Sequence, residues 1–324
     1  MSQPFTNSMK PFPFPLRLPA FAAPMFLISG PEIVLAACKA GIIGAFPTPN
    51  ARPIEVLDEW MQTITNGLAQ ARSDNPAAVI GPWAANLVTH STNARLPEDL
   101  ALVAKFKPPI VITALGSPKP AIEIVHGYGG LVFADVINLK LARKAAEAGV
   151  DGLACIGAGA GGHTGNLTPF SFVPAVREFF DGFIIIGGGI ADGSAIFAAR
   201  ALGADLVYMG TRFIPCAESL AVPAYKQMIV DCDADDLIVS AAITGSRASW
   251  LKPSLAANGL DPDQLPEAPK RDYNSNTGFK DKRWLDVWAA GQGVGASARI
   301  EPLANIVDDL EQGYRAARLA AAQI

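Results

Sequence analysis

The sequence predicts an α/β fold: a (β/α)8 TIM barrel with a helical excursion over one mouth and a C-terminal closing helix. Short apolar runs alternate with longer amphipathic stretches, the runs are bounded by Gly, Pro or Asn, and eight strand–helix pairs can be counted. The predicted strands are residues 20–23, 42–45, 79–84, 110–113, 131–135, 152–156, 183–187 and 206–210. Helical periodicity follows at residues 31–40, 53–72, 97–106, 118–125 and 139–148, several of which begin at proline, as a first helical turn allows.

This pattern divides the chain into four segments. Residues 1–19 form an N-terminal extension, residues 20–216 the barrel, residues 217–284 a helical and loop lid, and residues 285–324 a segment that packs back on the barrel. Helices are expected at 219–230 and 306–322, with a polar stretch at 255–282 between them. Because loops this long are commonly lids or binding elements, we expect residues 217–284, called the excursion below, to cover a barrel mouth.

Composition favours an enzyme with a small-molecule partner. The net charge is only −4 and no basic stripe is present, which argues against nucleic acid. No apolar run reaches the roughly 18 to 20 residues of a membrane span, and no secretory leader is evident, so a cytoplasmic location is the default expectation. The four cysteines are widely spaced and predict buried thiols, with no metal site. A homodimer is compatible with the sequence.

Two neighbouring predicted strands end in glycines that suit an anion. The strand at 183–187 runs into Gly188 and Gly189, and the strand at 206–210 ends at Gly210, followed by the hydroxyl of Thr211. Glycines there let backbone N–H groups approach an anion, and the dipole of the following helix favours negative charge. Because TIM barrels commonly bind phosphate after strands seven and eight, the pair predicts a phosphate site.

One of the three histidines lies where a barrel active site forms. His163 belongs to the glycine loop, residues 157–165, which follows the sixth strand. Small neighbours leave room for a flat ligand, and imidazole titrates near neutrality, so His163 is the candidate general base. His90 and His126 lie in loop-like surroundings and are expected to be structural or surface residues.

Other residues are expected at the same mouth. Ala23, Pro24 and Met25 end the first strand, and Asn86 follows the third. Several chemistries have no support: paired carboxylates for glycoside hydrolysis are not evident, no Gly-x-Ser-x-Gly elbow is present, and no Walker-type lysine follows the glycines.

In this order, the segments resemble the nitronate monooxygenase family, formerly called 2-nitropropane dioxygenases, which also includes flavin-dependent enoyl thioester reductases. The resemblance runs from about Phe21 to the C-terminal region. It is carried by Ala23-Pro24-Met25, by residues 148–152 leading into Ala160-Gly161-Gly162-His163-Thr164-Gly165, by residues 188–193, and by residues 201–205 through 209–213. Glu218-Ser219 and residues 290–295 also fit.

The resemblance implies an FMN-dependent oxidoreductase whose partners are a small anion such as a nitronate, and oxygen. It implies that Ala23, Pro24, Met25 and Asn86 contact the FMN ring, with Gly161 and Gly162 nearby, and that Gly188, Gly189, Gly210 and Thr211 hold its phosphate. His163 matches the family's catalytic histidine, which would remove the α-proton of a neutral nitroalkane. Gln292 is a weaker candidate for the cofactor neighbourhood.

The chain departs from the family at two positions. Ile156 stands where many relatives have Gln or Asp before the glycine loop, and Asp135 stands where some have Lys at the end of strand five, near the flavin. A carboxylate there makes a negative flavin ring less favourable and changes which anionic substrates bind.

Two alternatives remain at this point. One is an NAD(P)H-dependent FMN reductase of an enoyl thioester or a quinone. The other, from a different class, is a non-redox barrel that binds a phosphorylated ligand, or a purine nucleotide enzyme resembling inosine monophosphate dehydrogenase. The latter requires a nucleophilic cysteine in the loop after strand six, whereas Cys155 lies inside the predicted strand and His163 in the loop.

Overall fold

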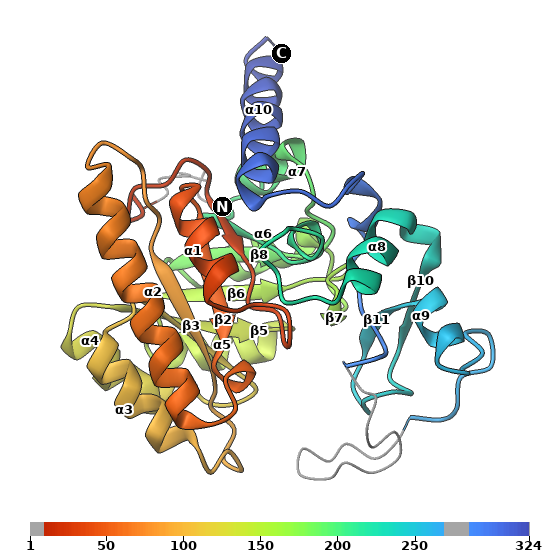
Figure 1. Ribbon diagram of the computed structural model, residues 1–324, viewed down its shortest axis with the longest axis horizontal. Coiled ribbons are helices and arrows are strands. Elements are labelled where there is room, and N and C mark those ends of the chain that lie inside the picture. The colour runs from red at the N-terminus through yellow and green to blue at the C-terminus, as the bar shows by residue number, and fades with distance from the viewer. Residues whose placement is uncertain (1–9, 269–284, 324) are drawn as a thin grey trace, which may run out of the picture.

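The computed structural model, which describes residues 10–268 and 285–323, is built around a closed barrel of eight parallel strands (Figure 1). The barrel strands are β1 Ala20–Ala22, β2 Ile43–Pro47, β3 Trp83–Val88, β4 Ile110–Ala114, β5 Leu131–Val136, β6 Gly152–Ile156, β8 Phe183–Gly187 and β9 Leu206–Met209. They pair in this order, and β9 returns to pair with β1. The predicted (β/α)8 barrel is confirmed.

The third strand begins later than the sequence analysis predicted. The expected strand was residues 79–84, whereas β3 starts at Trp83 and includes Asn86, which was expected to follow the strand. Pro82 has no N–H to give to a ladder, and the N–H of Gly81 is bonded to the carbonyl of Cys38, so the chain enters the sheet only after both residues.

Alternate residues of each strand fill the barrel interior. Phe21, Ile43, Phe133 and Tyr208 belong to one buried cluster inside the ring of strands. At the amino-terminal end of the barrel, Phe12 packs edge-on against Phe183, the first residue of β8, with ring centroids 5.4 Å apart. Phe12, Phe14 and Leu16 pack against the interior cluster and thus close this end, so the carboxyl-terminal end is the one available for a site.

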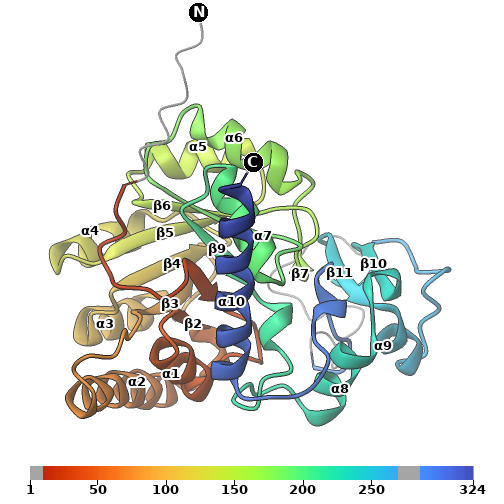
Figure 2. The same ribbon diagram turned by 90° about the horizontal axis from the view of Figure 1, so that it is seen from above.

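A second, larger core lies between the strands and the outer helices, which cover the barrel in Figure 2. The helices are α1 Pro31–Lys39, α2 Ile54–Asp74, α3 Leu96–Phe106, α4 Lys119–Gly127, α5 Leu139–Glu147, α6 Pro169–Arg177, α7 Gly193–Ala201 and α10 Leu303–Ala321. The predicted closing helix is α10, which starts three residues earlier than expected and packs against α7.

The contact between α7 and α10 depends on a missing side chain at Gly193. A Cβ there would lie 2.1 Å from the backbone nitrogen of Tyr314 and 2.4 Å from the carbonyl oxygen of Leu310. Because both are backbone atoms, we expect Gly193→Ala to lower the free energy of unfolding by about 2–4 kcal/mol in chemical denaturation. Gly127→Ala is the control, since a Cβ at this helix position meets no atom within 4 Å and alanine favours the helix by roughly 0.5–1 kcal/mol. Equal stabilities of the two variants would contradict this account.

The excursion lies beside the barrel in Figure 1 and is not purely helical. It contains α8 Pro223–Asp231, β10 Leu237–Ser240, β11 Ala248–Leu251 and α9 Lys252–Ala257. The helix expected at 219–230 begins instead at Pro223, because proline suits the first turn and Ser219 bonds back to the carbonyl of Ile214. The part of the expected lid at 269–284 lies outside the described residues.

The two strands of the excursion form a small antiparallel sheet. Its order is β10-β11-β7, and β7 is Gly162–His163 of the glycine loop. This sheet was not predicted from the sequence. Across the described parts of the chain, no helix is both long enough and apolar enough to cross a membrane.

Candidate active site

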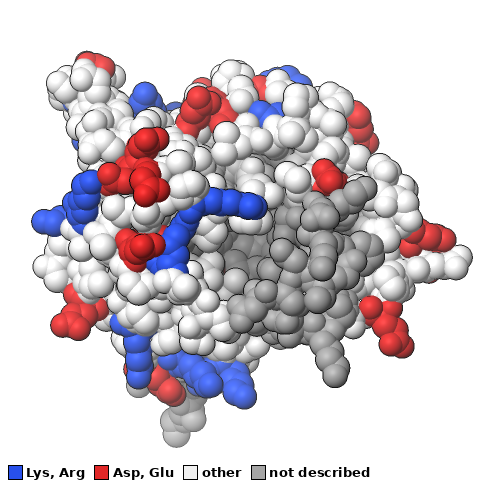
Figure 3. Space-filling view, turned by 60° about the horizontal axis from the view of Figure 1, so that its bottom comes forward, with Lys and Arg blue, Asp and Glu red and all other residues white. Residues whose placement is uncertain are grey.

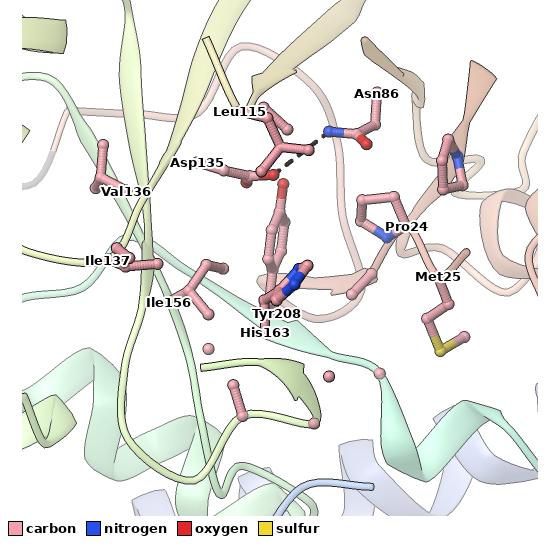
Figure 4. Close-up of a pocket in the computed structure, with 18 of the residues that line it drawn as sticks. Pro24, Met25, Asn86, Leu115, Asp135, Val136, Ile137, Ile156, His163 and Tyr208 are labelled. Carbon is pink, nitrogen blue, oxygen red and sulfur yellow. Dashed lines mark hydrogen bonds between the residues drawn. The ribbon is translucent and has the colours of Figure 1, made fainter. Parts of the chain in front are cut away.

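A cavity of about 1640 Å³ opens at the carboxyl-terminal end of the barrel, bounded by the strand ends and the excursion. Ligand pockets usually measure roughly 300–1,000 Å³, so this one has room for a cofactor and a substrate together. His163 and all the predicted cofactor-binding residues line it: Ala23, Pro24, Met25, Asn86, Gly161, Gly162, Gly188, Gly189, Gly210 and Thr211. Figure 4 shows several of these side chains around the cavity.

The backbone after β8 requires glycine at two successive positions. Gly188 has φ +130° and Gly189 φ +70°. A Cβ at position 188 would stand 2.5 Å from the carbonyl oxygen of Ala158, whereas a Cβ at 189 would meet only the side-chain oxygen of Gln292, at 4.0 Å. The side of Gly189 where a Cβ would stand is therefore open to the cavity, whereas its N–H donates a hydrogen bond of 3.1 Å to the carbonyl of Gly159. Gln292 lies beside it, with its own N–H bonded to the carbonyl of Gly159.

The end of β9 supplies a hydroxyl next to these glycines. Gly210 precedes a short 3-10 helix, Thr211–Phe213, and a Cβ on Gly210 would meet no atom closer than 3.5 Å. The hydroxyl oxygen of Thr211 accepts a hydrogen bond of 2.8 Å from the N–H of Gly291. Its own hydrogen therefore stays available to donate to an anion.

The start of α7 does not contribute to this anion site as the sequence analysis expected. The helix begins only at Gly193, and Asp192 caps it by accepting a hydrogen bond of 2.7 Å from the N–H of Ala195. A carboxylate already satisfies the positive end of the helix dipole. The candidates that remain for an anion site are the turn at Gly188 and Gly189 and the Gly210-Thr211 turn, all of which line the cavity.

His163 is exposed, lines the cavity and is held in place by the excursion. Its backbone pairs with Ala248 of β11, and the N–H of the next residue, Thr164, donates a hydrogen bond of 3.2 Å to the carbonyl of Arg247. The hydroxyl of Thr164 also donates to the carbonyl of Gly157, at 3.1 Å, which closes the loop on itself. The glycine loop is therefore an ordered strand edge, and sequence reasoning missed the partner that orders it.

Three polar side chains lie at the floor of the cavity, on the barrel interior. The amide of Asn86 donates to one carboxylate oxygen of Asp135 at 3.4 Å, and Tyr208 points toward the same carboxyl in Figure 4. Burial raises the pKa of Asp135 to about 7, although the Asn86 amide opposes the shift. Burial, and secondarily the charge of Asp135, raise the pKa of Tyr208 above its ordinary range.

Sequence reasoning missed Tyr208 as a site residue. The available signal was a hydroxyl-bearing residue at an inward position of an otherwise aliphatic strand, two residues before Gly210. Asp135 was identified only as a departure from the family, and the structure places it inside β5 near the strand's end.

The rest of the cavity wall is largely apolar, and its outer part, the rim, carries three lysines and one glutamate, Glu147. Ile156 lines the barrel side, and the rings of Tyr225 and Trp288 stack on the excursion side, with centroids 4.9 Å apart. The lysines that line the outer part are Lys119, Lys140 and Lys144. Figure 3 shows one face of the molecule, on which both Lys and Arg side chains and Asp and Glu side chains are exposed. The rim attracts anions toward the apolar interior.

The other chemistry-bearing residues lie away from the cavity. His126 is bonded to Asp151 at 2.8 Å, before β6 and at the opposite end of the barrel. All four cysteines are buried thiols, as predicted. Within residues 10–268 and 285–323, no group of three or more His, Cys, Asp or Glu side chains is placed to hold a metal ion.

Comparison with known proteins agrees with this geometry. The sequence model of the nitronate monooxygenase family matches residues 11–313. A nitronate monooxygenase from Paraburkholderia phytofirmans is 29% identical over 335 residues, which cover 91% of each protein. The structure of nitroalkane oxidase from Streptomyces ansochromogenes matches with a TM-score of 0.78 and 22% identity, covering 94% of this chain and 97% of that one. FabK from Thermotoga maritima matches with a TM-score of 0.71 and 23% identity, covering 95% and 96%. At these identities the two structures show a shared fold.

The family match and the cavity define a flavin-dependent oxidoreductase. The chain belongs to the nitronate monooxygenase family.

Proposed function

We propose that this protein is an FMN-dependent nitronate monooxygenase that oxidises alkyl nitronates with oxygen, and neutral nitroalkanes after His163 removes their α-proton. The observation that carries the proposal is the convergence of His163 and the predicted cofactor residues on one cavity. The family relationship supports the same activity.

The residues present fit FMN. The open space beside Gly189 and the hydroxyl hydrogen of Thr211, which is left to donate, suit a phosphate. Ala23, Pro24 and Met25 at the end of β1, with Gly161 and Gly162 across the cavity, leave a space bounded by small or apolar groups for a flat ring. Bound FMN supplies a two-electron acceptor that oxygen returns to its oxidised form.

Side chains of the protein attract the substrate, exclude water and remove the proton. The rim lysines Lys119, Lys140 and Lys144 raise the local concentration of anionic substrate. The apolar wall, with Ile156 and the Tyr225–Trp288 stack, excludes water and accommodates the alkyl part of the substrate. His163 accepts the α-proton of a neutral nitroalkane, which produces the nitronate inside the cavity.

Anaerobic mixing of the purified flavoprotein with propionate-3-nitronate tests the proposal. The nitronate is expected to bleach the visible absorbance of the oxidised flavin, and air should restore it. The control is NAD(P)H under the same conditions, which is expected to leave the spectrum unchanged. Bleaching by NAD(P)H alone would instead identify a reductase of an enoyl thioester or quinone. A protein that stays colourless after reconstitution with FMN would rule out the cofactor.

A further inference from the structure

The cavity floor holds two buried oxygen atoms that have no hydrogen-bond partner. They are the second carboxylate oxygen of Asp135 and the hydroxyl of Tyr208. Both residues line the cavity, and both lie on the inward-facing side of their strands, two positions after Phe133 and Leu206. A buried polar atom without a partner costs free energy, so such atoms beside a cavity indicate a ligand that completes them.

The two oxygens belong to one arrangement. Asn86 holds the other oxygen of Asp135, and Figure 4 shows the hydroxyl of Tyr208 directed at the same carboxyl from the opposite side. Inward-facing residues of the flanking strands, Ile112 and Ala154, carry no titratable group. In the described chain, no ion pair reaches Asp135. The other titratable residues that line this cavity are His163, Tyr208, Tyr225, Glu147, Lys119, Lys140 and Lys144.

The order of the strands around the barrel places the Asp135 carboxyl beside a flat ligand that is bound at the phosphate site. In the closed ring β1-β2-β3-β4-β5-β6-β8-β9, β3 lies opposite β8, and β5 lies opposite β1. A ligand held at Gly188 and Gly189 that reaches Asn86 must therefore cross the mouth. Because Asn86 is bonded to Asp135, the far part of that ligand lies next to the Asp135 carboxyl.

We propose that Asp135 takes up a proton whenever the bound flavin ring is reduced. The inference rests on the proposed function, because it requires FMN in this cavity. Reduction transfers two electrons from the reductant, nitronate or dithionite, and one proton from solvent to the ring, which leaves one negative charge on it. The carboxylate of Asp135 takes a second proton from solvent, so that two negative charges do not face each other. Two protons are then bound for every two electrons.

Burial of the Asp135 carboxyl places this proton uptake near neutral pH. The pKa of Asp135, about 7 because of desolvation, rises further when a negative ring lies beside it. Between about pH 7 and this higher pKa, the carboxyl is therefore ionised before flavin reduction and protonated after it. Tyr208 does not titrate in this range, since its pKa is raised above its ordinary value.

The test is the midpoint potential of the bound flavin, measured against pH between about pH 7 and pH 9 in a dithionite titration. The wild-type slope is expected to be twice that of Asp135→Asn, because the amide binds no second proton. Tyr208→Phe is the matched control: it removes the neighbouring hydroxyl and should keep the wild-type slope. His163→Asn should also keep it, which assigns the second proton to Asp135.

Equal slopes in wild type and Asp135→Asn would overturn the inference, with the proposed function unaffected. Asp135→Ser provides a second variant if the Asn variant fails to fold. Proton uptake by the wild type, followed with an indicator dye at about pH 8 and corrected for the protons that dithionite itself releases on oxidation, gives a count that needs no variant. Two protons per flavin support the inference, and one proton refutes it. Dithionite replaces the nitronate in this titration, so a failure of nitronate oxidation is detected separately.

Discussion

His163→Ala is expected to lower kcat/KM for a neutral nitroalkane by about 10²–10⁴-fold, the usual contribution of a positioned general base. The same variant should oxidise a preformed nitronate at nearly the wild-type rate, because that substrate has already lost its α-proton. Steady-state oxygen consumption with 2-nitropropane and with its nitronate measures both values. The two substrates thus separate a loss of base catalysis from a loss of structure.

The matched control is His126→Ala. His126 is 2.8 Å from Asp151 at the opposite end of the barrel and does not line the cavity. Both substrates should react with it as with the wild type. An equal fall with both substrates in His163→Ala would show that the histidine binds or orients the nitro group instead of removing a proton.

Gly188→Ala is expected to weaken FMN binding by about 10- to 100-fold, which corresponds to the roughly 1–3 kcal/mol cost of a strained backbone. Position 188 has φ +130°, and an added Cβ would stand 2.5 Å from the carbonyl oxygen of Ala158. Relief of that contact moves the backbone at 188–189 away from the phosphate position. Fluorescence titration of the apoprotein with FMN measures the change in Kd.

Gly149→Ala controls for strain alone. Gly149 has φ +91°, but a Cβ there meets no atom within 4 Å, and the residue does not line the cavity. It should lower the free energy of unfolding by about 1 kcal/mol and leave the Kd for FMN unchanged. Equal Kd values for the Gly188 and Gly149 variants would mean that the phosphate is bound elsewhere.

The barrel and the position of the cavity were predictable from the sequence because both depend on local patterns. Apolar runs that end in glycine mark buried parallel strands, and the carboxyl ends of these strands share one face of a barrel, so the sequence alone places Gly188 and Gly210 close together. The predicted start of β3 was wrong because Gly81 and Pro82 continue the apolar run without joining the sheet.

The features that could not be predicted from the sequence depend on contacts between segments that are distant along the chain. The pairing of His163 with Ala248 joins the glycine loop to a strand more than 80 positions away, and neither partner carries a turn or periodicity signal for it. The inward direction of Tyr208 follows from strand period, but its approach to Asp135 depends on the closure of the barrel. The capped start of α7, by contrast, is a local feature: Asp192 stands directly before the helical run, where an N-cap residue is expected, and it caps the helix.

The pairing of β7 with β11 limits which segments can be exchanged independently between related enzymes. The segment that forms the outer wall of the cavity is also the hydrogen-bonding partner of the strand that carries His163. A chimera that exchanges residues 217–293 between two relatives therefore replaces β11, the support of the histidine, together with Tyr225 and Trp288 of the wall. Such a graft is therefore expected to change the substrate range and the proposed proton abstraction by His163 together.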